Sequence, residues 1–152
     1  MKLAEALVLR ADAQKRLGQL RDRLRLSALV QEGEQPPENP QELLEQLNVL
    51  LAQLEDLIIK INRANMQTSL GDGTILTDAL ARRDVLTHRY NSLSGLVDTA
   101  SNRTDRYGRS EIRKLSTVDV AALRQQMDDV ARMRRELDTQ IQATNWTADL
   151  PE

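Results

Sequence analysis

The feature that most constrains the fold is the spacing of apolar residues between residues 41 and 66. Leucines and isoleucines recur there every three or four residues, which places them on one face of a helix. The members of this stripe are Leu43, Leu44, Leu47, Leu50, Leu51, Leu54, Leu57, Ile58 and Ile61. Asn39 suits the N-cap and Pro40 the first helical position. The pattern predicts a long amphipathic helix over residues 41–66.

Three further segments show helical spacing, and we predict helices over about residues 3–29, 77–100 and 118–143. Phe is absent, Trp occurs once and Tyr twice, which favours aliphatic packing between long helices over a β-sandwich. The connections are short compared with the helices, so consecutive helices should be antiparallel. We therefore predict an all-α fold, an up-down-up-down bundle of four long helices that forms a single domain over residues 1–152.

Two connections and the chain end leave local alternatives open. Gly71, Asp72 and Gly73 are a turn signal, which fits either a small β-hairpin arm or a plain loop. Residues 101–116 are polar and basic, and they fit a loop, a strand paired with that arm, or a subunit interface. The single Trp146 follows the last predicted helix, and we expect it to dock back onto the fold.

Charge and composition disfavour several classes of partner. The 21 basic and 23 acidic residues leave a net charge of -2, so no overall field attracts nucleic acid or an anionic membrane. The chain has no Cys, which removes disulfides and cysteine metal sites and fits a cytoplasmic protein. No apolar run approaches the ~20 residues that span a bilayer. We expect a cytoplasmic protein, with nucleic acid and membranes disfavoured as partners.

Residues with common catalytic or metal-binding chemistry are sparse. His88 is the only histidine, and one histidine cannot form the multi-histidine cluster typical of catalytic zinc. Glu42 and Glu45 resemble the acidic pair of all-α nucleotide pyrophosphatases, but acids are common at helix starts and no matching acidic cluster follows. No Ser-His-Asp arrangement or P-loop is readable. We expect no catalytic residues, no metal and no cofactor. The sequence favours a non-enzymatic protein, and an enzyme stays an open alternative.

Five polar residues interrupt or flank the predicted core faces. Arg10 lies near the middle of the apolar stripe of the first helix, and Arg82 and Arg83 straddle the core face of the third. Asn65 continues the stripe of the second helix, and Asn62 flanks it. In an up-down-up-down bundle these positions share one end, so we predict that the five side chains converge there.

Buried guanidinium groups without carboxylate partners cost several kcal/mol each, so this predicted cluster needs compensation. One interpretation is structural, with carbonyl groups, Asp78, water and a neighbouring subunit as partners. The other is a site for a small anion, such as a phosphate or carboxylate, between the arginines and the start of the third helix.

Two further patterns suggest macromolecular partners. Val8, Leu26, Val49 and Ile59 lie outside the core stripes of their helices, which favours a homo-oligomer. Residues 103–114 combine Arg103, Arg106, Arg109, Arg113 and Lys114 with Tyr107. This run fits nucleic-acid contact, although a solvated loop or contact with an acidic surface of a neighbouring subunit is favoured.

Five sequence segments carry a family resemblance that covers essentially the whole chain. They are MKLAEAL (1–7), LVQEGEQPPE (29–38), INRAN (61–65), LTDALARRD (76–84) and LDTQIQATNW (137–146). Together they resemble a bacterial family of small uncharacterised helical proteins, some of which carry the name septicolysin. The resemblance implies no catalytic residues, and the name implies a pore-forming cytolysin.

The function hypotheses follow in order of preference. The first is a homo-oligomeric helical protein that acts through binding or assembly. The second is a protein or enzyme that binds a small anionic ligand at the arginine-rich end of the bundle. The third is the cytolysin, which is disfavoured because the chain shows no export signal and no aromatic-rich amphipathic segment.

Overall fold

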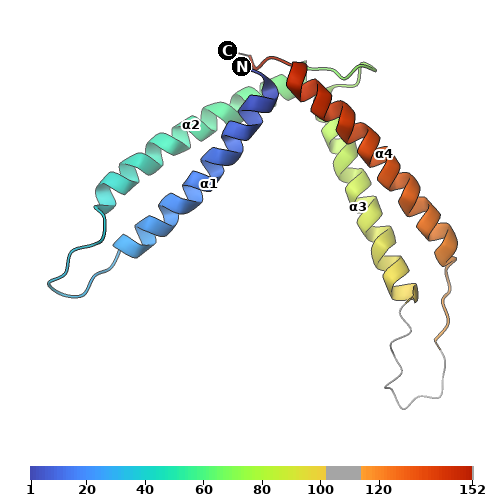
Figure 1. The fold of residues 1–152 in the computed structure, drawn as a ribbon, viewed down its shortest axis with the longest axis horizontal. Coiled ribbons are helices and arrows are strands. Elements are labelled where there is room, and N and C mark those ends of the chain that lie inside the picture. The colour runs from blue at the N-terminus through green and yellow to red at the C-terminus, as the bar shows by residue number, and fades with distance from the viewer. Residues whose placement is uncertain (102–113, 152) are drawn as a thin grey trace. The chain divides into compact units, whose positions relative to one another are not determined.

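A computed structural model describes residues 1–101 and 114–151 and contains four long α-helices (Figure 1). They are α1 (Leu3–Ser27), α2 (Pro40–Gln67), α3 (Leu76–Ser101) and α4 (Val120–Thr147). The predicted all-α helical-bundle class is confirmed, and the described part of the chain contains no β-strand longer than an isolated bridge.

The fourth helix extends further than predicted. It ends at Thr147 instead of residue 143, so Trp146 belongs to its last turn. The Trp146 side chain is 62 % exposed, and the expectation that it docks back onto the fold is wrong. A helical backbone fixes the direction of each side chain, and this position points away from the buried face that contains Ile141 and Asn145.

The chain divides into two compact units, which are Met1–Thr68 together with Ala143–Glu152, and Ser69–Gln142. The prediction of a single domain over residues 1–152 stays a prediction.

In the first unit, α1 and α2 pack along one apolar seam. Asn39 Oδ1 accepts a hydrogen bond from the Gln41 backbone N–H at 3.0 Å, and Pro40 is the first residue of α2, as the sequence predicts. Leu24 and Leu47 flank the seam, partly buried. The buried members of the seam are Ala13, Leu17, Leu20, Leu43, Leu50 and Leu54.

The start of α1 is tied to the segment that follows α4. The Leu3 N–H donates to the Ala148 carbonyl at 3.0 Å, and the Leu150 N–H donates to the Met1 carbonyl at 2.9 Å. Lys2 Nζ lies 2.8 Å from Asp149 Oδ1, and this contact lowers the pKa of Asp149. The two ends of the chain therefore belong to the same unit.

The far end of the α1–α2 hairpin has its own ion pair. Arg23 Nε donates to Glu38 Oε2 at 2.8 Å, and Arg23 Nη2 contacts Glu38 Oε1, so the guanidinium and carboxylate pair in the bidentate manner. The hydrogen bond from Arg23 lowers the pKa of Glu38. The pair joins α1 to the connection that precedes α2.

In the second unit, α3 and α4 lie side by side. The Arg134 guanidinium lies over the Tyr90 ring, 5.5 Å from its centroid, a cation–π contact between the two helices. Leu76, Leu86 and Val130 are buried.

Before α3, the predicted arm is a tight turn with a single antiparallel bridge between Ser69 and Ile75. The Leu70 N–H donates to the Thr74 carbonyl at 2.8 Å, and Gly73 has a φ of 84°, which favours glycine. Residues 114–117 form no regular structure, and the proposed strand pairing of residues 111–113 lies outside the described residues.

The neighbouring pair Leu50 and Leu51 tests the seam. Leu50 is 3 % exposed and Leu51 is 40 % exposed. We expect Leu50→Ala to lower the free energy of unfolding by about 2–5 kcal/mol because it leaves a cavity. Leu51→Ala should lower it by less than about 1 kcal/mol. Urea unfolding followed by circular dichroism measures both, and equal losses would contradict the position of the seam.

The Arg23–Glu38 pair predicts a specific dependence of stability on pH. Because the pKa of Glu38 is lower in the folded protein, its contribution is present above the unfolded pKa and is lost as the pH falls through the folded pKa. We expect Glu38→Gln to lower the melting temperature at neutral pH and to match the wild type once Glu38 is protonated. Glu34→Gln makes the same charge change in the same connection and should not show this convergence. If the difference in melting temperature between Glu38→Gln and the wild type stayed the same at every pH, the role of the pair would be contradicted.

Candidate functional site

The five residues of the predicted arginine cluster are divided between the two compact units. Arg10, Asn62 and Asn65 belong to the first unit, whereas Arg82 and Arg83 belong to the second. The convergence of all five in one site therefore stays a prediction.

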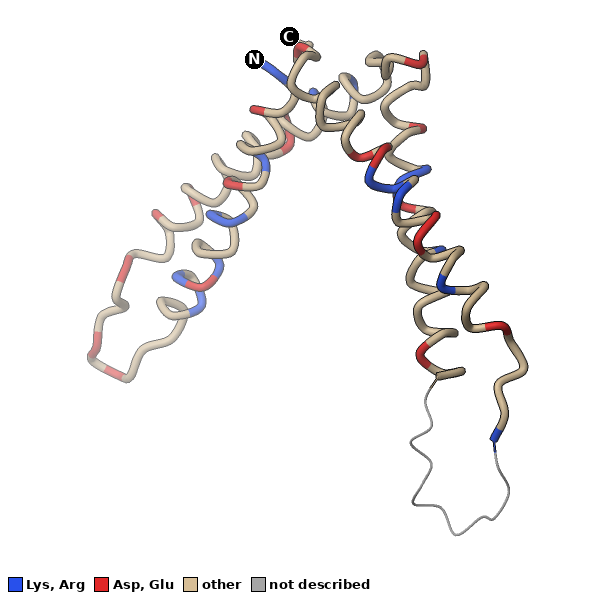
Figure 2. The backbone as a smooth tube through the Cα atoms, turned by 45° about the vertical axis from the view of Figure 1, so that its right-hand side comes forward, with Lys and Arg blue, Asp and Glu red and all other residues tan. Residues whose placement is uncertain are grey.

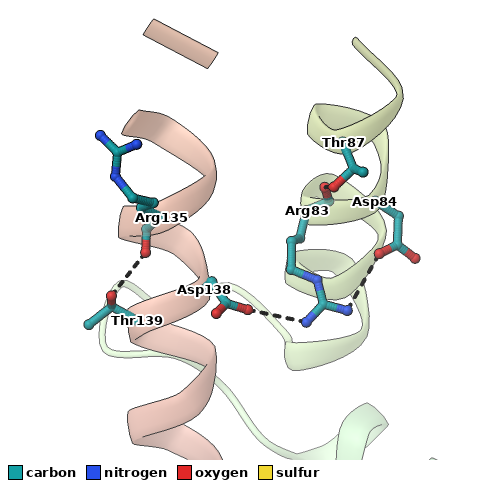
Figure 3. Close-up of polar contacts among 6 residues, drawn as sticks. All are labelled: Arg83, Asp84, Thr87, Arg135, Asp138 and Thr139. Atoms are coloured by element: carbon teal, nitrogen blue, oxygen red, sulfur yellow. Dashed lines mark hydrogen bonds and ion pairs between the residues drawn. The ribbon is translucent and has the colours of Figure 1, made fainter. Parts of the chain in front are cut away.

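Arg83 has carboxylate partners within the second unit (Figure 3). Its Nη1 donates to Asp138 Oδ1 at 3.3 Å, and its Nη2 donates to Asp84 Oδ1 at 3.4 Å. The Arg83 side chain is 32 % exposed, so its charge is only partly removed from water. Asp138 comes from α4, and this contact is not predictable from periodicity because the spacing of apolar residues does not give the register of α4 against α3. Arg82 is exposed.

Arg10 shows a different situation on α1. Its side chain is half-buried, and its Nε is buried without a hydrogen-bond partner among the described residues. A buried donor left unsatisfied costs about 1–3 kcal/mol. Asn65 is half-buried and Asn62 is exposed. Arg10 is therefore the one residue of the predicted site that has a buried polar atom without a hydrogen-bond partner in the described part of the chain.

The structure reveals a second candidate site that the sequence analysis missed, an open groove between α1 and α2. Its larger part has a volume of about 550 Å³ and its smaller part about 300 Å³. Arg16, Leu50 and Gln53 line both parts, so the two parts are continuous. The groove thus follows much of the hairpin.

The walls of this α1–α2 groove carry charges of opposite sign. Arg16 and Arg23 line it from α1, while Glu42 and Glu45 line it from α2. In Figure 2, basic segments mark the second half of α1 and acidic segments mark the start of α2 and the connection before it. The sequence signal that could have indicated this groove is a run of polar residues at helical spacing beside the apolar stripe. This polar run contains Glu42 and Glu45.

The groove has an apolar floor and an exposed apolar residue on each wall, and the α1 wall residue is Leu9, which is 48 % exposed. Leu20 and Leu50 are buried at its base, and Val49 on its α2 side is 59 % exposed. The groove thus combines apolar surface with charges of both signs, a composition found in protein–protein interfaces.

The other structural features bear on chemistry and membranes. Within residues 1–101 and 114–151, no three His, Asp or Glu side chains are grouped closely enough to hold a metal ion. In the same part of the chain, no helix has the length and apolar content of a membrane span. Most of the basic segment 103–114 lies outside the described residues.

Comparison with known proteins adds a family and a structural relative. The family model described as "Family of unknown function (DUF6847)" matches residues 10–150. A crystal structure of a functionally unknown conserved protein from Corynebacterium diphtheriae is 43 % identical over 99 % of each chain, with a TM-score of 0.93. No curated protein matches the sequence. Both findings agree with the predicted resemblance to uncharacterised proteins, and neither mentions septicolysin. The chain belongs to the DUF6847 family of unknown function.

Proposed function

We propose that this protein is a cytoplasmic, homo-oligomeric helical protein that works through assembly, with the α1–α2 groove as the contact surface. Two packed helices bury one stripe of each other and leave their remaining apolar side chains uncovered. All four residues that the sequence placed outside the core stripes are exposed, namely Val8, Leu26, Val49 and Ile59.

The observation that carries this proposal is the position of Val49. It is a β-branched apolar side chain, mostly exposed, on the wall of a groove whose floor is already apolar. A partner that filled the groove would remove Val49 from water, and burying a Val side chain contributes about 1.5–3 kcal/mol.

The opposite side of α2 is a weaker candidate. Leu44, Leu51 and Ile58 recur there every seven residues, but each is only 36–42 % exposed, so more than half of each is already covered. Val49 and Leu51 are two residues apart, about 200° around the helix axis. The two sides can therefore be tested separately.

Light scattering over a range of protein concentrations tests the assembly. We expect the wild type to exceed the monomer mass and Val49→Asp to raise the dissociation constant at least about tenfold, which corresponds to about 1.4 kcal/mol. Val85→Asp makes the same change at a residue of similar exposure on α3 and should leave association unchanged. A monomer mass for the wild type at every concentration would contradict the proposal.

The unsatisfied Nε of Arg10 supports a second candidate function, binding of a small anion. A bound phosphate or carboxylate would accept a hydrogen bond from this group and should raise the melting temperature by mass action. We expect phosphate to stabilise the wild type and not Arg10→Met, which removes the donor. Arg21→Met, at an exposed position of the same helix, should keep the response. No response of the wild type to phosphate, nucleotides or carboxylates would rule this candidate out.

The disfavoured third alternative is pore formation, which the name septicolysin implies. Release of haemoglobin from erythrocytes by the purified protein distinguishes this activity from assembly alone. Lysis that increases with protein concentration would favour the cytolysin over the proposed function.

A further inference from the structure

Charged residues follow the groove side of both helices in a regular order. On α1 the acids come first and the bases follow, and on α2 the order is the same. On α1 spacings of four and seven residues keep the set on one side of the helix, and on α2 the two acids recur as bases eighteen residues later, which is five full turns. The residues that line the groove are Asp12, Arg16 and Arg23 on α1 and Glu42, Glu45 and Asp56 on α2. Glu5 on α1 and Lys60 and Arg63 on α2 continue the same side of their helices beyond it.

Apart from Asp56, which pairs with Lys60 of its own helix, the positions of these charges are symmetric about the middle of the groove. On α1, Asp12 and Arg16 each lie two residues from Gln14, and Glu5 and Arg23 each lie nine residues from it. In both pairs an acid stands opposite a base across the same centre. A two-fold rotation about that centre would therefore bring each acid to a base.

The same symmetry holds on α2 about a centre between Ala52 and Gln53. Glu45 and Lys60 lie at equal distances along the chain from this centre, and so do Glu42 and Arg63. Ala13, Arg16 and Gln53 line the same part of the groove, so the centres on α1 and α2 are at the same level. One axis can therefore serve both helices.

We propose that a second copy of this chain docks on the α1–α2 groove through a two-fold axis that lies in the interface, perpendicular to the helices, and crosses α1 at the level of Gln14 and α2 at the level of Gln53. Each helix then lies antiparallel to its own counterpart, which gives the isologous contact typical of dimers. Asp12 faces Arg16 of the second copy, and Glu45 faces Lys60 of the second copy. This geometry rests on the proposed function, because it specifies the surface and direction of the assembly.

The ion pairs already present leave most of these charges available. Within the described part of the chain, Asp12, Arg16, Glu45 and Arg63 form no ion pair. Asp56 on the same side of α2 is paired with Lys60 at 3.1 Å, and Arg23 is paired with Glu38. Asp12 and Arg16 lie nearest the proposed axis, so they provide the cleanest test.

The balance of charges selects a second copy over other partners. Acids and bases alternate in blocks on this side of the hairpin, so the surface has no dominant sign that would attract nucleic acid or an anionic membrane. A partner must instead present the same blocks in reverse order. A second copy related by a two-fold axis does so without further requirement, and matched charges give orientation and specificity.

Disulfide trapping tests the axis directly, because the native chain has no cysteine. Gln53→Cys places a thiol next to the axis, and oxidation should give a covalent dimer, since disulfides need Cα atoms within about 7 Å. Gln46→Cys also lines the groove but lies between six and seven residues from the axis, so its two copies would be roughly 20 Å apart and should not cross-link. Equal cross-linking of both variants, or none by Gln53→Cys in a protein that forms oligomers, would overturn the geometry.

Charge reversal provides an independent readout. Asp12→Arg or Arg16→Asp alone should raise the dissociation constant about tenfold, and the combined variant should return to within about threefold of the wild type. Leu51→Gln, on the other side of α2, should leave association unchanged. Oligomers that depend on Val49 and ignore Asp12 would overturn this geometry while leaving the proposed function intact. Oligomers that depend on Leu51 instead would contradict the groove as the contact surface. A wild type that stays monomeric would remove both.

Discussion

The seam between α1 and α2 is the contact on which the first unit depends. Two helices packed together bury one stripe each, and any apolar side chain outside that stripe stays near the surface. The apolar face of α2 is broader than the seam, so burying Leu50 and Leu54 leaves Leu51 and Ile58 partly exposed beside them. Val49 is exposed on the other side, where the groove forms. The exposed apolar surface is a consequence of this mismatch in width.

The charge pattern along the groove has a cause within each helix, and it also bears on the proposed dimer. Acids near the N-terminus and bases near the C-terminus of a helix are stabilised by the helix dipole. Both α1 and α2 follow this preference on their groove side, with Glu5 and Glu42 early and Arg23 and Arg63 late. In an antiparallel copy of the same helix the order of charges runs in the opposite direction, so its bases would lie opposite the acids of the first copy. In the proposed dimer, this preference of single helices would become complementarity between two copies.

Arg10 and Arg83 show why residue type and periodicity are not enough to identify a site. Both interrupt apolar faces in the sequence. Arg83 meets Asp138 from the neighbouring helix, and partial exposure of both side chains keeps this pair weak in its effect on stability. Arg10 retains a buried Nε with no partner in the described part of the chain. The difference depends on which residue the adjacent helix places opposite each arginine.

The sequence by itself determined the four helices, the cap at Asn39 and the apolar seam, because hydrophobic period and capping chemistry are local properties of the chain. It also identified Val49 as a residue outside its core stripe. The tertiary structure decided which helix lies beside which face and in what register. That register placed Asp138 next to Arg83, opened the groove beside Val49, and set Arg16 at the level of Gln53. These contacts join residues that are distant in the chain, and spacing along one helix carries no information about the position of another.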